Sequence, residues 1–153
     1  DITTLLKSGP VFQSIIEGWK ERYAEQNLHA IVGAEARGFI FGAALAYALR
    51  LPFIPVRKPG KLPAETLAES FELEYGVDQL EIHVDALKRG DRVVVVDDLL
   101  ATGGTMAAIC RLVERLGAEI VEIAFVIELS FLKGREKLAP YRVHTLVEFA
   151  EGT

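Results

Sequence analysis

Residues Val93 to Thr105 read VVVVDDLLATGGT, and this stretch decides the fold. Consecutive valines predict a strand over Arg92 to Asp97 that is buried on both faces, as strands at the centre of a parallel sheet are. The following glycines predict a tight turn, and apolar residues recur at helical spacing over Gly103 to Leu116. A buried strand that passes through a glycine turn into a helix is typical of α/β proteins.

The same alternation of helix and strand continues on both sides of this stretch. Helical spacing of apolar residues predicts helices over 11–26 and 38–50, and Pro55 suggests that the strand containing it lies at a sheet edge. The further strands are predicted at His29–Gly33, Phe53–Arg57, Glu119–Leu129 and Val143–Phe149. We therefore expect residues 1–153 to form one domain, an α/β three-layer sandwich with a mainly parallel central sheet.

A loop that contains prolines and glycine interrupts this alternation over Lys58 to Ser70. Short alternating segments at Phe71–Tyr75 and Leu80–Val84 flank the turn residues 76–79, which predicts an antiparallel hairpin. Long loops inside compact domains usually serve function. We therefore expect residues 58–84 to form a flexible hairpin lid.

The end of the valine strand has the chemistry of a phosphate-binding turn. Glycines let backbone N–H groups approach an anion, a helix N-terminus carries partial positive charge, and threonine hydroxyls donate further hydrogen bonds. The carboxylates of Asp97 and Asp98 would repel a phosphate, which favours a role in binding sugar hydroxyls or a divalent cation. A ribose 5-phosphate meets both requirements. Each element alone fits a strand end, a helix cap or a tight turn better, but their combination in this order at a strand end favours the ligand site.

Composition and charge narrow the class of protein. Half of the residues are hydrophobic and a quarter are charged, as in globular domains, and the formal charge of −5 argues against an extended nucleic-acid-binding face. Cys110 is the only cysteine, which excludes an internal disulfide and fits a reducing compartment, so we expect a cytoplasmic protein. The apolar run Phe39 to Leu49 is too short to span a membrane.

Two other nucleotide-binding motifs do not fit. Gly33 to Gly38 has the glycine spacing of a Walker loop, but Phe39 stands where the essential lysine would be. No G-x-G-x-x-G motif follows a predicted strand, which argues against a Rossmann dinucleotide site.

The stretch VVVVDDLLATGGT resembles the phosphoribosyl-pyrophosphate signature of the type I phosphoribosyltransferases. The resemblance continues through GAEARGFIFGAALA, VRKPGKLPAETLAESFELEYG, LEIHVDAL and LKGREKLAP, and within the family the chain is similar to members that act on adenine. It implies the fold of that family and a role in purine salvage, in which phosphoribosyl pyrophosphate (PRPP) and adenine give AMP and pyrophosphate. It also implies Mg²⁺ as a cofactor, carried by PRPP rather than held directly by protein residues.

The resemblance assigns roles to individual residues of the signature. Asp97 and Asp98 would hold the ribose hydroxyls. The 5′-phosphate would be held by Ala101, Thr102, Gly103, Gly104 and Thr105. In the family, an F-P-x-P-G-x-x-F-R segment before an Asp-Ile pair contributes to the adenine pocket. This sequence begins with that pair, so we expect it to lack the segment.

Basic residues elsewhere are candidates for binding pyrophosphate. Arg37 lies between a predicted strand and a helix, and Arg57, Lys58 and Lys61 form the densest basic cluster of the chain, with ordinary surface exposure as the alternative for both lysines. In the resembled family the loop matching 35–38 binds pyrophosphate and often contains a non-proline cis peptide. Family members are commonly dimers in which a residue matching Arg57 reaches the neighbouring site, so we expect a homodimer.

The predicted hairpin carries the candidate catalytic residue. Glu74 matches the family's L-E-Y-G motif, which implies a general acid or base acting at the purine, and Tyr75 would close over the reactants. The alternative for Glu74 is an ordinary charged residue on a solvent-facing strand.

Two other functions remain open at the level of sequence. A phosphoribosyltransferase for xanthine, hypoxanthine-guanine or orotate would share the phosphate turn and differ in the base site. A non-catalytic regulator would sense PRPP and bind nucleic acid. The acidic charge balance and the presence of Glu74 weigh against the regulator.

Overall fold

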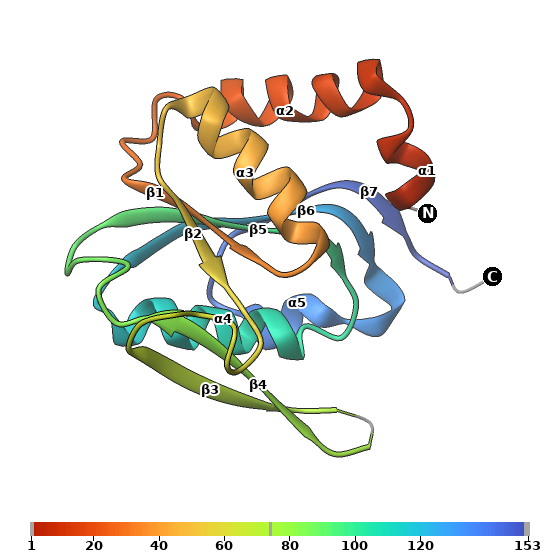
Figure 1. The fold of residues 1–153 in the computed structure, drawn as a ribbon. Helices are drawn as coiled ribbons and strands as arrows, with labels where there is room; N and C mark the ends of the chain where they lie inside the picture. Colours follow the sequence, from red (N-terminus) through yellow and green to blue (C-terminus); the bar gives the residue numbers. More distant parts are fainter. Residues whose placement is uncertain (1, 74, 152–153) are drawn as a thin grey trace.

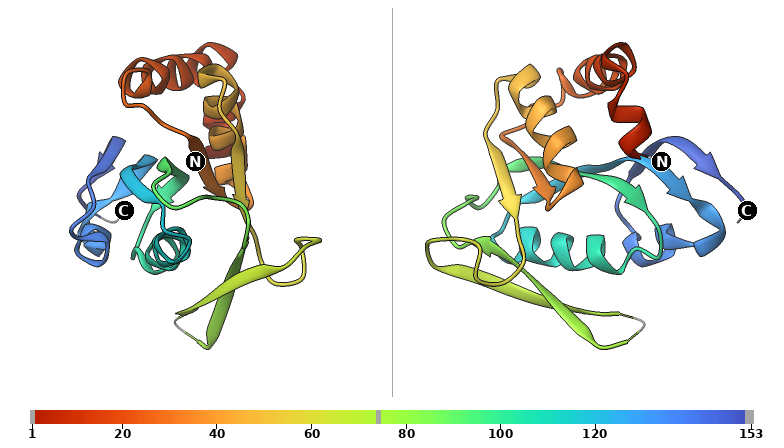
Figure 2. Two further views of the ribbon diagram at one scale, coloured as in Figure 1. Left: turned by 90° about the vertical axis from the view of Figure 1, so that its left-hand side faces the viewer. Right: turned by 45° about the vertical axis from the view of Figure 1, so that its right-hand side comes forward.

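The computed structural model describes residues 2–73 and 75–151. A five-stranded, all-parallel sheet of order β2-β1-β5-β6-β7 lies between two helical layers (Figures 1 and 2). Its strands are β1 (Ala30–Ala34), β2 (Phe53–Val56), β5 (Arg92–Leu100), β6 (Glu119–Leu129) and β7 (Val143–Phe149). One face is covered by α1 (Ile2–Leu6), α2 (Gly9–Tyr23) and α3 (Arg37–Leu49), and the other by α4 (Gly104–Arg115) and α5 (Gly134–Leu138). The predicted three-layer α/β sandwich is confirmed.

The valine strand β5 lies at the centre of the sheet, as predicted. Val93 and Val95 pack into the core beneath α4, whereas Val94 and Val96 pack into the core beneath α2 and α3. All four side chains are 0% exposed. Because successive side chains of a strand point to opposite faces, only a strand covered on both sides requires an unbroken apolar run.

The edge strand β2 is the one that its proline predicted. Pro55 lies in β2, which is an edge strand, where the missing N–H of proline does not break a ladder on both sides. No helix within the described part of the chain is long and apolar enough to cross a membrane.

The valine strand is longer than predicted. β5 continues past Asp97 to Leu100, because its register with β6 extends to the pair Leu100 and Glu128. Both aspartates therefore lie within the strand and not beyond its end. The short helices α1 and α5 were not predicted, since each has only five residues and shows no helical repeat.

The hairpin is formed by β3 (Thr66–Glu72) and β4 (Val77–His83), so its first strand begins earlier than predicted and shortens the preceding loop. Phe71, Leu80 and Ile82 are buried in the core shared with α4. The base of the predicted lid is therefore an integral part of the domain, and its far end extends away from the sheet (Figure 1).

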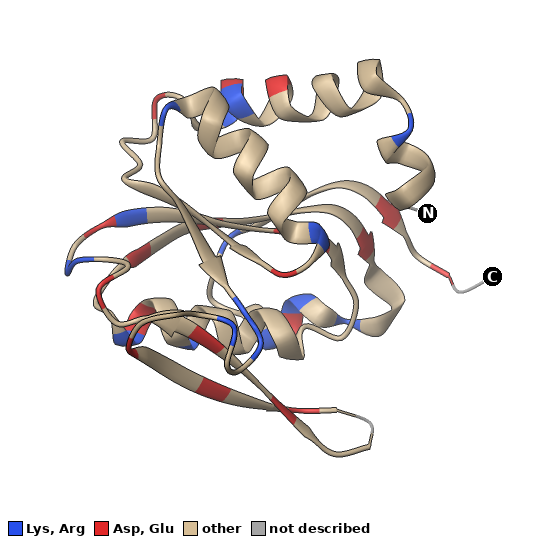
Figure 3. Ribbon diagram, viewed as in Figure 1, with Lys and Arg blue, Asp and Glu red and all other residues tan. Residues whose placement is uncertain are grey.

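Arginines of α4 hold the hairpin through Glu69. Arg111 Nε donates to one Glu69 carboxylate oxygen at 2.8 Å and Arg115 Nη1 to the other at 2.8 Å. The same two side chains donate to the carbonyl oxygens of Ser70 and Ala68, at 3.0 and 2.7 Å. Acidic positions along the hairpin and basic positions on α4 are visible in Figure 3.

A buried carboxylate ties α2 to the sheet. Glu122 of β6, 3% exposed, accepts hydrogen bonds from Arg22 Nε at 2.6 Å and from the Tyr23 hydroxyl at 2.7 Å. Burial alone would raise the pKa of Glu122, but these hydrogen bonds outweigh it and lower the pKa below its ordinary value. The group is therefore ionised at neutral pH and anchors the C-terminal end of α2.

Candidate active site

A cavity of about 170 Å³ opens at the carboxyl end of β5, between that strand and the first turns of α3 and α4. This is where ligands bind in open parallel sheets. Its lining comprises Arg37, Asp97, Asp98, Leu99, Leu100, Ala101, Thr102, Gly103, Gly104, Thr105, Met106 and Phe125. The structure thus brings together Arg37, the two aspartates and the whole predicted phosphate turn.

The two aspartates of β5 have different surroundings because neighbouring strand residues point to opposite faces. Asp98 is 5% exposed, and its Oδ2 lies 2.7 Å from Arg37 Nε in an ion pair. Asp97 Oδ1 accepts a hydrogen bond from the Asp98 backbone N–H at 2.8 Å. Burial, reinforced by the neighbouring Asp98 carboxyl, raises the pKa of Asp97 well above its ordinary value.

Gly38 allows the start of α3 to press against the end of β5. A Cβ atom at this position would lie 2.8 Å from Asp97 Oδ1 and 3.3 Å from the Val96 carbonyl oxygen. Only a residue without a side chain fits this approach, which brings Arg37 to the cavity. The peptide bond between Glu35 and Ala36 is cis, as the family resemblance implied for this loop.

The phosphate turn is built on backbone atoms. Gly103 has φ +90° and precedes α4, whose first backbone N–H groups donate to no side-chain cap, and Gly103, Gly104 and Thr105 all line the cavity. A Cβ atom at Gly103 would lie 2.6 Å from the Gly134 carbonyl oxygen. A Cβ atom at Gly134 would in turn lie 2.5 Å from the Ala101 carbonyl oxygen. The turn therefore rests directly on the backbone at the start of α5.

Gly134 was missed by the sequence reasoning. The available signal was its place in LKGREKLAP, which carried the family resemblance but gave no local reason for the glycine. The reason is a contact with a segment about thirty positions away, which spacing along the chain does not reveal.

The remaining basic candidates lie outside this cavity, on the segment that follows β2 (blue in Figure 3). Arg57 Nε donates to Glu35 Oε1 at 3.3 Å, and its guanidinium lies 5.8 Å from the centre of the Phe39 ring. Lys58 pairs with Asp78 of β4. Lys61 is exposed. The cavity thus contains Arg37 alone from the predicted pyrophosphate set.

The hairpin candidates stand apart from the cavity. Tyr75 is 88% exposed at the hairpin turn and does not line the cavity. Glu74 lies outside the described residues. No described residue of the hairpin lines the cavity.

An apolar pocket of about 270 Å³ adjoins the first cavity. It shares Arg37, Asp98 and Leu99 with that cavity and is otherwise lined by Ile2, Ile127, Leu129 and Phe149. The sequence reasoning did not identify the last three, because they read only as ordinary apolar strand residues. The two spaces together offer a polar half at the glycine turn and a largely apolar half beside it.

Known proteins resemble this chain over nearly its whole length. The model of the phosphoribosyl transferase domain matches residues 1–152. The adenine phosphoribosyltransferase of Roseiflexus sp. (strain RS-1) is 56% identical over 149 residues, which cover 97% of this chain and 87% of that protein. This chain belongs to the adenine phosphoribosyltransferase family. The family resemblance noted in the sequence is thereby confirmed.

Solved structures of the adenine phosphoribosyltransferase family share the fold. The enzyme of Thermoanaerobacter pseudethanolicus superposes with a TM-score of 0.93 at 54% identity, covering 97% of this chain and 87% of that one. The Saccharomyces cerevisiae enzyme, complexed with an imino-altritol bisphosphate and adenine, gives a TM-score of 0.90 at 45% identity, covering 95% and 85%. The agreement extends over the whole sheet and its hairpin, since nearly the whole chain is covered.

Proposed function

We propose that this member of the family transfers the phosphoribosyl group of PRPP to adenine, giving AMP and pyrophosphate in purine salvage. The observation that carries the proposal is the juxtaposition of an anion-binding turn, a pair of aspartates and an apolar pocket at the end of β5. PRPP requires the first two, and a purine ring requires the third.

The phosphate turn would hold the 5′-phosphate with the N–H groups of 102–105 and the partial positive charge of the α4 N-terminus. Asp97 and Asp98 would accept hydrogen bonds from the ribose hydroxyls, and binding would draw Asp98 away from its ion pair with Arg37. Arg37 is then free to bind pyrophosphate. Mg²⁺ would enter with PRPP, and carboxylate oxygens at the cavity suit a hard cation of this kind.

The adenine ring would occupy the apolar pocket beside Leu99, Leu129 and Phe149. This places the attacking ring nitrogen next to the sugar, because the pocket and the cavity share Arg37 and Asp98. The anomeric carbon would pass through an oxocarbenium-like state as pyrophosphate leaves. Glu74 would exchange the purine proton and Tyr75 would cover the reactants to exclude water.

A homodimer completes the proposal. Ile40 and Tyr47, one heptad apart on α3, are 42% and 87% exposed, so one face of this helix presents apolar side chains to solvent. Arg57 lies outside its own subunit's cavity, which agrees with a role in the neighbouring site. Sedimentation at micromolar concentration tests this, with Tyr47→Asp expected to give monomers. The cytoplasmic location stays a prediction from the cysteine content.

The test of function is pyrophosphate release from PRPP and Mg²⁺ with adenine, hypoxanthine, guanine, xanthine and orotate in parallel. Release with adenine alone supports the proposal, and release with another base alone overturns the base assignment. We expect Glu74→Gln to lower kcat more than it changes KM, and Asp98→Asn chiefly to raise the KM for PRPP. Equal and small effects of both substitutions would contradict these roles.

A further inference from the structure

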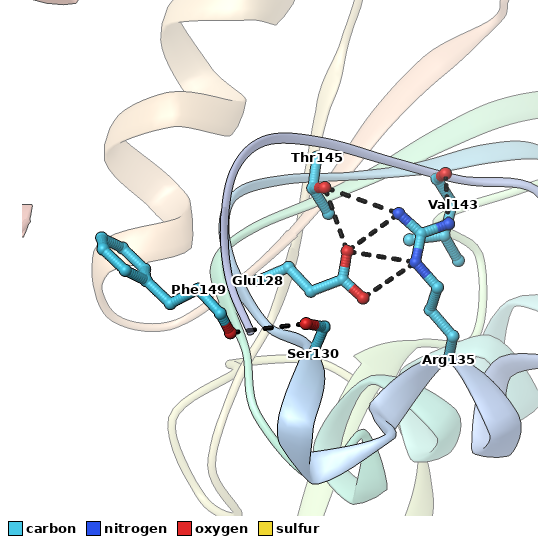
Figure 4. A network of polar contacts seen from close by, with 6 residues as sticks. All are labelled: Glu128, Ser130, Arg135, Val143, Thr145 and Phe149. Carbon is cyan, nitrogen blue, oxygen red and sulfur yellow. Dashed lines mark hydrogen bonds and ion pairs between the residues drawn. The ribbon is translucent and has the colours of Figure 1, made fainter. Parts of the chain in front are cut away.

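Glu128 is a buried carboxylate close to the site that the proposed chemistry does not use. It is 3% exposed near the carboxyl end of β6 and precedes Leu129 of the apolar pocket. Its two oxygens accept hydrogen bonds from Arg135 Nε at 2.8 Å and Nη2 at 2.9 Å, and the Thr145 hydroxyl donates at 3.1 Å (Figure 4). An isolated buried charge is costly, and the hydrogen bonds from Arg135 and Thr145 compensate the Glu128 carboxylate for its burial.

Arg135 connects this carboxylate to three elements. It lies in the first turn of α5, donates to both carboxylate oxygens of Glu128 near the end of β6 through the Nε–Nη2 edge of its guanidinium group, and donates from Nη1 to the Val143 carbonyl oxygen of β7 at 3.0 Å. The planar fork of arginine fixes direction as well as distance. These hydrogen bonds tie α5 to β6 and β7, and the buried Leu138 is the apolar anchor of the same helix.

The first residue of α5 is Gly134, on which the phosphate turn rests. Its backbone lies against Ala101 and Gly103. A Cβ atom at Gly103 would overlap the Gly134 carbonyl oxygen, and a Cβ atom at Gly134 would overlap the Ala101 carbonyl oxygen. A movement of α5 would therefore be transmitted to the turn without an intervening side chain. The hydrogen bonds of Arg135 keep the pKa of Glu128 below its ordinary value despite burial, so the pair stays charged at neutral pH.

We propose that the Glu128–Arg135 pair is a positioning unit for the phosphate turn, acting through the backbone contact of Gly134 with Ala101 and Gly103. Neither side chain lines the cavity, so neither is a catalytic residue. The proposal rests on the function above in assigning the 5′-phosphate to this turn. If the pair positions the turn, its removal should weaken the binding only of ligands that carry a 5′-phosphate. A pair that merely stabilises the fold would show no such selectivity.

The test is calorimetric titration of wild type and variants with ribose 5-phosphate and, separately, with Mg²⁺-pyrophosphate. Arg135→Lys keeps the charge and loses the fork, and Glu128→Gln keeps the shape and loses the charge. Lys137→Met, an exposed position of the same helix outside this network, is the matched control. Urea unfolding of each variant shows the fraction folded at the titration temperature.

We expect both variants to bind ribose 5-phosphate about tenfold more weakly while their affinity for pyrophosphate stays within about twofold, because the loss of one hydrogen bond to a charged phosphate suffices for such a change. The control should match wild type for both ligands. Unchanged ribose 5-phosphate binding, or an equal loss for both ligands, overturns the inference. Should Arg135→Lys not fold, the double variant Glu128→Gln/Arg135→Met replaces it, since it leaves no unpaired charge. A wild type that binds no ribose 5-phosphate would instead refute the assignment of the 5′-phosphate to this turn, whereas the pyrophosphate-release assay tests the proposed function separately.

Discussion

Replacing Gly103 by alanine should destabilise the protein, whereas replacing the adjacent Gly104 should not. At Gly103 the backbone has φ +90°, a conformation that costs a residue with a side chain about 1 to 3 kcal/mol. The added Cβ atom would also lie 2.6 Å from the Gly134 carbonyl oxygen, and relieving an overpacked contact costs about 1 to 3 kcal/mol. We therefore expect Gly103→Ala to lower the free energy of unfolding by about 3 kcal/mol, against a typical total of about 5 to 15 kcal/mol.

Gly104 is the matched control. It is the first residue of α4, and a Cβ atom there would meet no atom within 4 Å. Alanine is a better helix former than glycine, so Gly104→Ala should raise the free energy of unfolding by up to about 1 kcal/mol. Because Gly104 lines the cavity, the same substitution should still weaken PRPP binding. Stability and binding would then change in opposite directions.

The assay is equilibrium urea unfolding followed by the fluorescence of Trp19, the single tryptophan, which is 1% exposed in α2 and packs against Phe41 of α3. A change in midpoint with an unchanged slope reports stability alone. A Gly103→Ala variant within about 0.5 kcal/mol of wild type would refute the reasoning, because surface changes without a special contact stay within that range. Equal losses in both glycine variants would refute it as well.

Three further substitutions test other parts of the structure. Gly38→Ala would push a Cβ atom toward Asp97 Oδ1 and should raise the KM for PRPP about tenfold in initial-rate assays; a KM near wild type would contradict the close approach. Glu69→Ala removes the carboxylate that binds two arginines of α4 and should cost about 1 kcal/mol and speed proteolysis of the hairpin, so an unchanged cleavage rate would count against that anchor. The lowered pKa of Glu122 contributes stability that is fully present above the unfolded-state pKa of about 4.3 and is lost as the pH falls through the folded-state value. Glu122→Gln should therefore flatten the acid side of a plot of unfolding free energy against pH, and a slope equal to that of wild type would exclude this contribution.

Most of the architecture was predictable because its signals are local. The valine run, the glycine turn and the helical repeat after it lie within about twenty-five residues. Each is recognised from neighbouring residues alone. The predicted strands over Glu119–Leu129 and Val143–Phe149 match the structure at both ends. The hairpin was less well predicted: its first strand begins at Thr66, where pairing with β4 and contact with α4 extend a segment whose own pattern is weak.

Some residues of the candidate site could likewise be identified from local sequence, and others could not. Asp97, Asp98 and the phosphate turn were identifiable because one continuous segment carries their chemistry. Arg37 was identifiable as a basic residue between a strand and a helix, but its ion pair with Asp98 was not. The lining of the apolar pocket by Leu129 and Phe149 was not identifiable either, since it depends on which strands lie side by side.

The sequence by itself determined an α/β fold, a central buried strand and a phosphate turn, because periodicity, glycine placement and charge act over a few neighbouring residues. Only the tertiary structure decided which segments meet at that turn. The contacts of Gly38 with Asp97 and of Gly134 with Gly103 join segments many residues apart. They follow from the strand order β2-β1-β5-β6-β7, which no local pattern in the chain specifies.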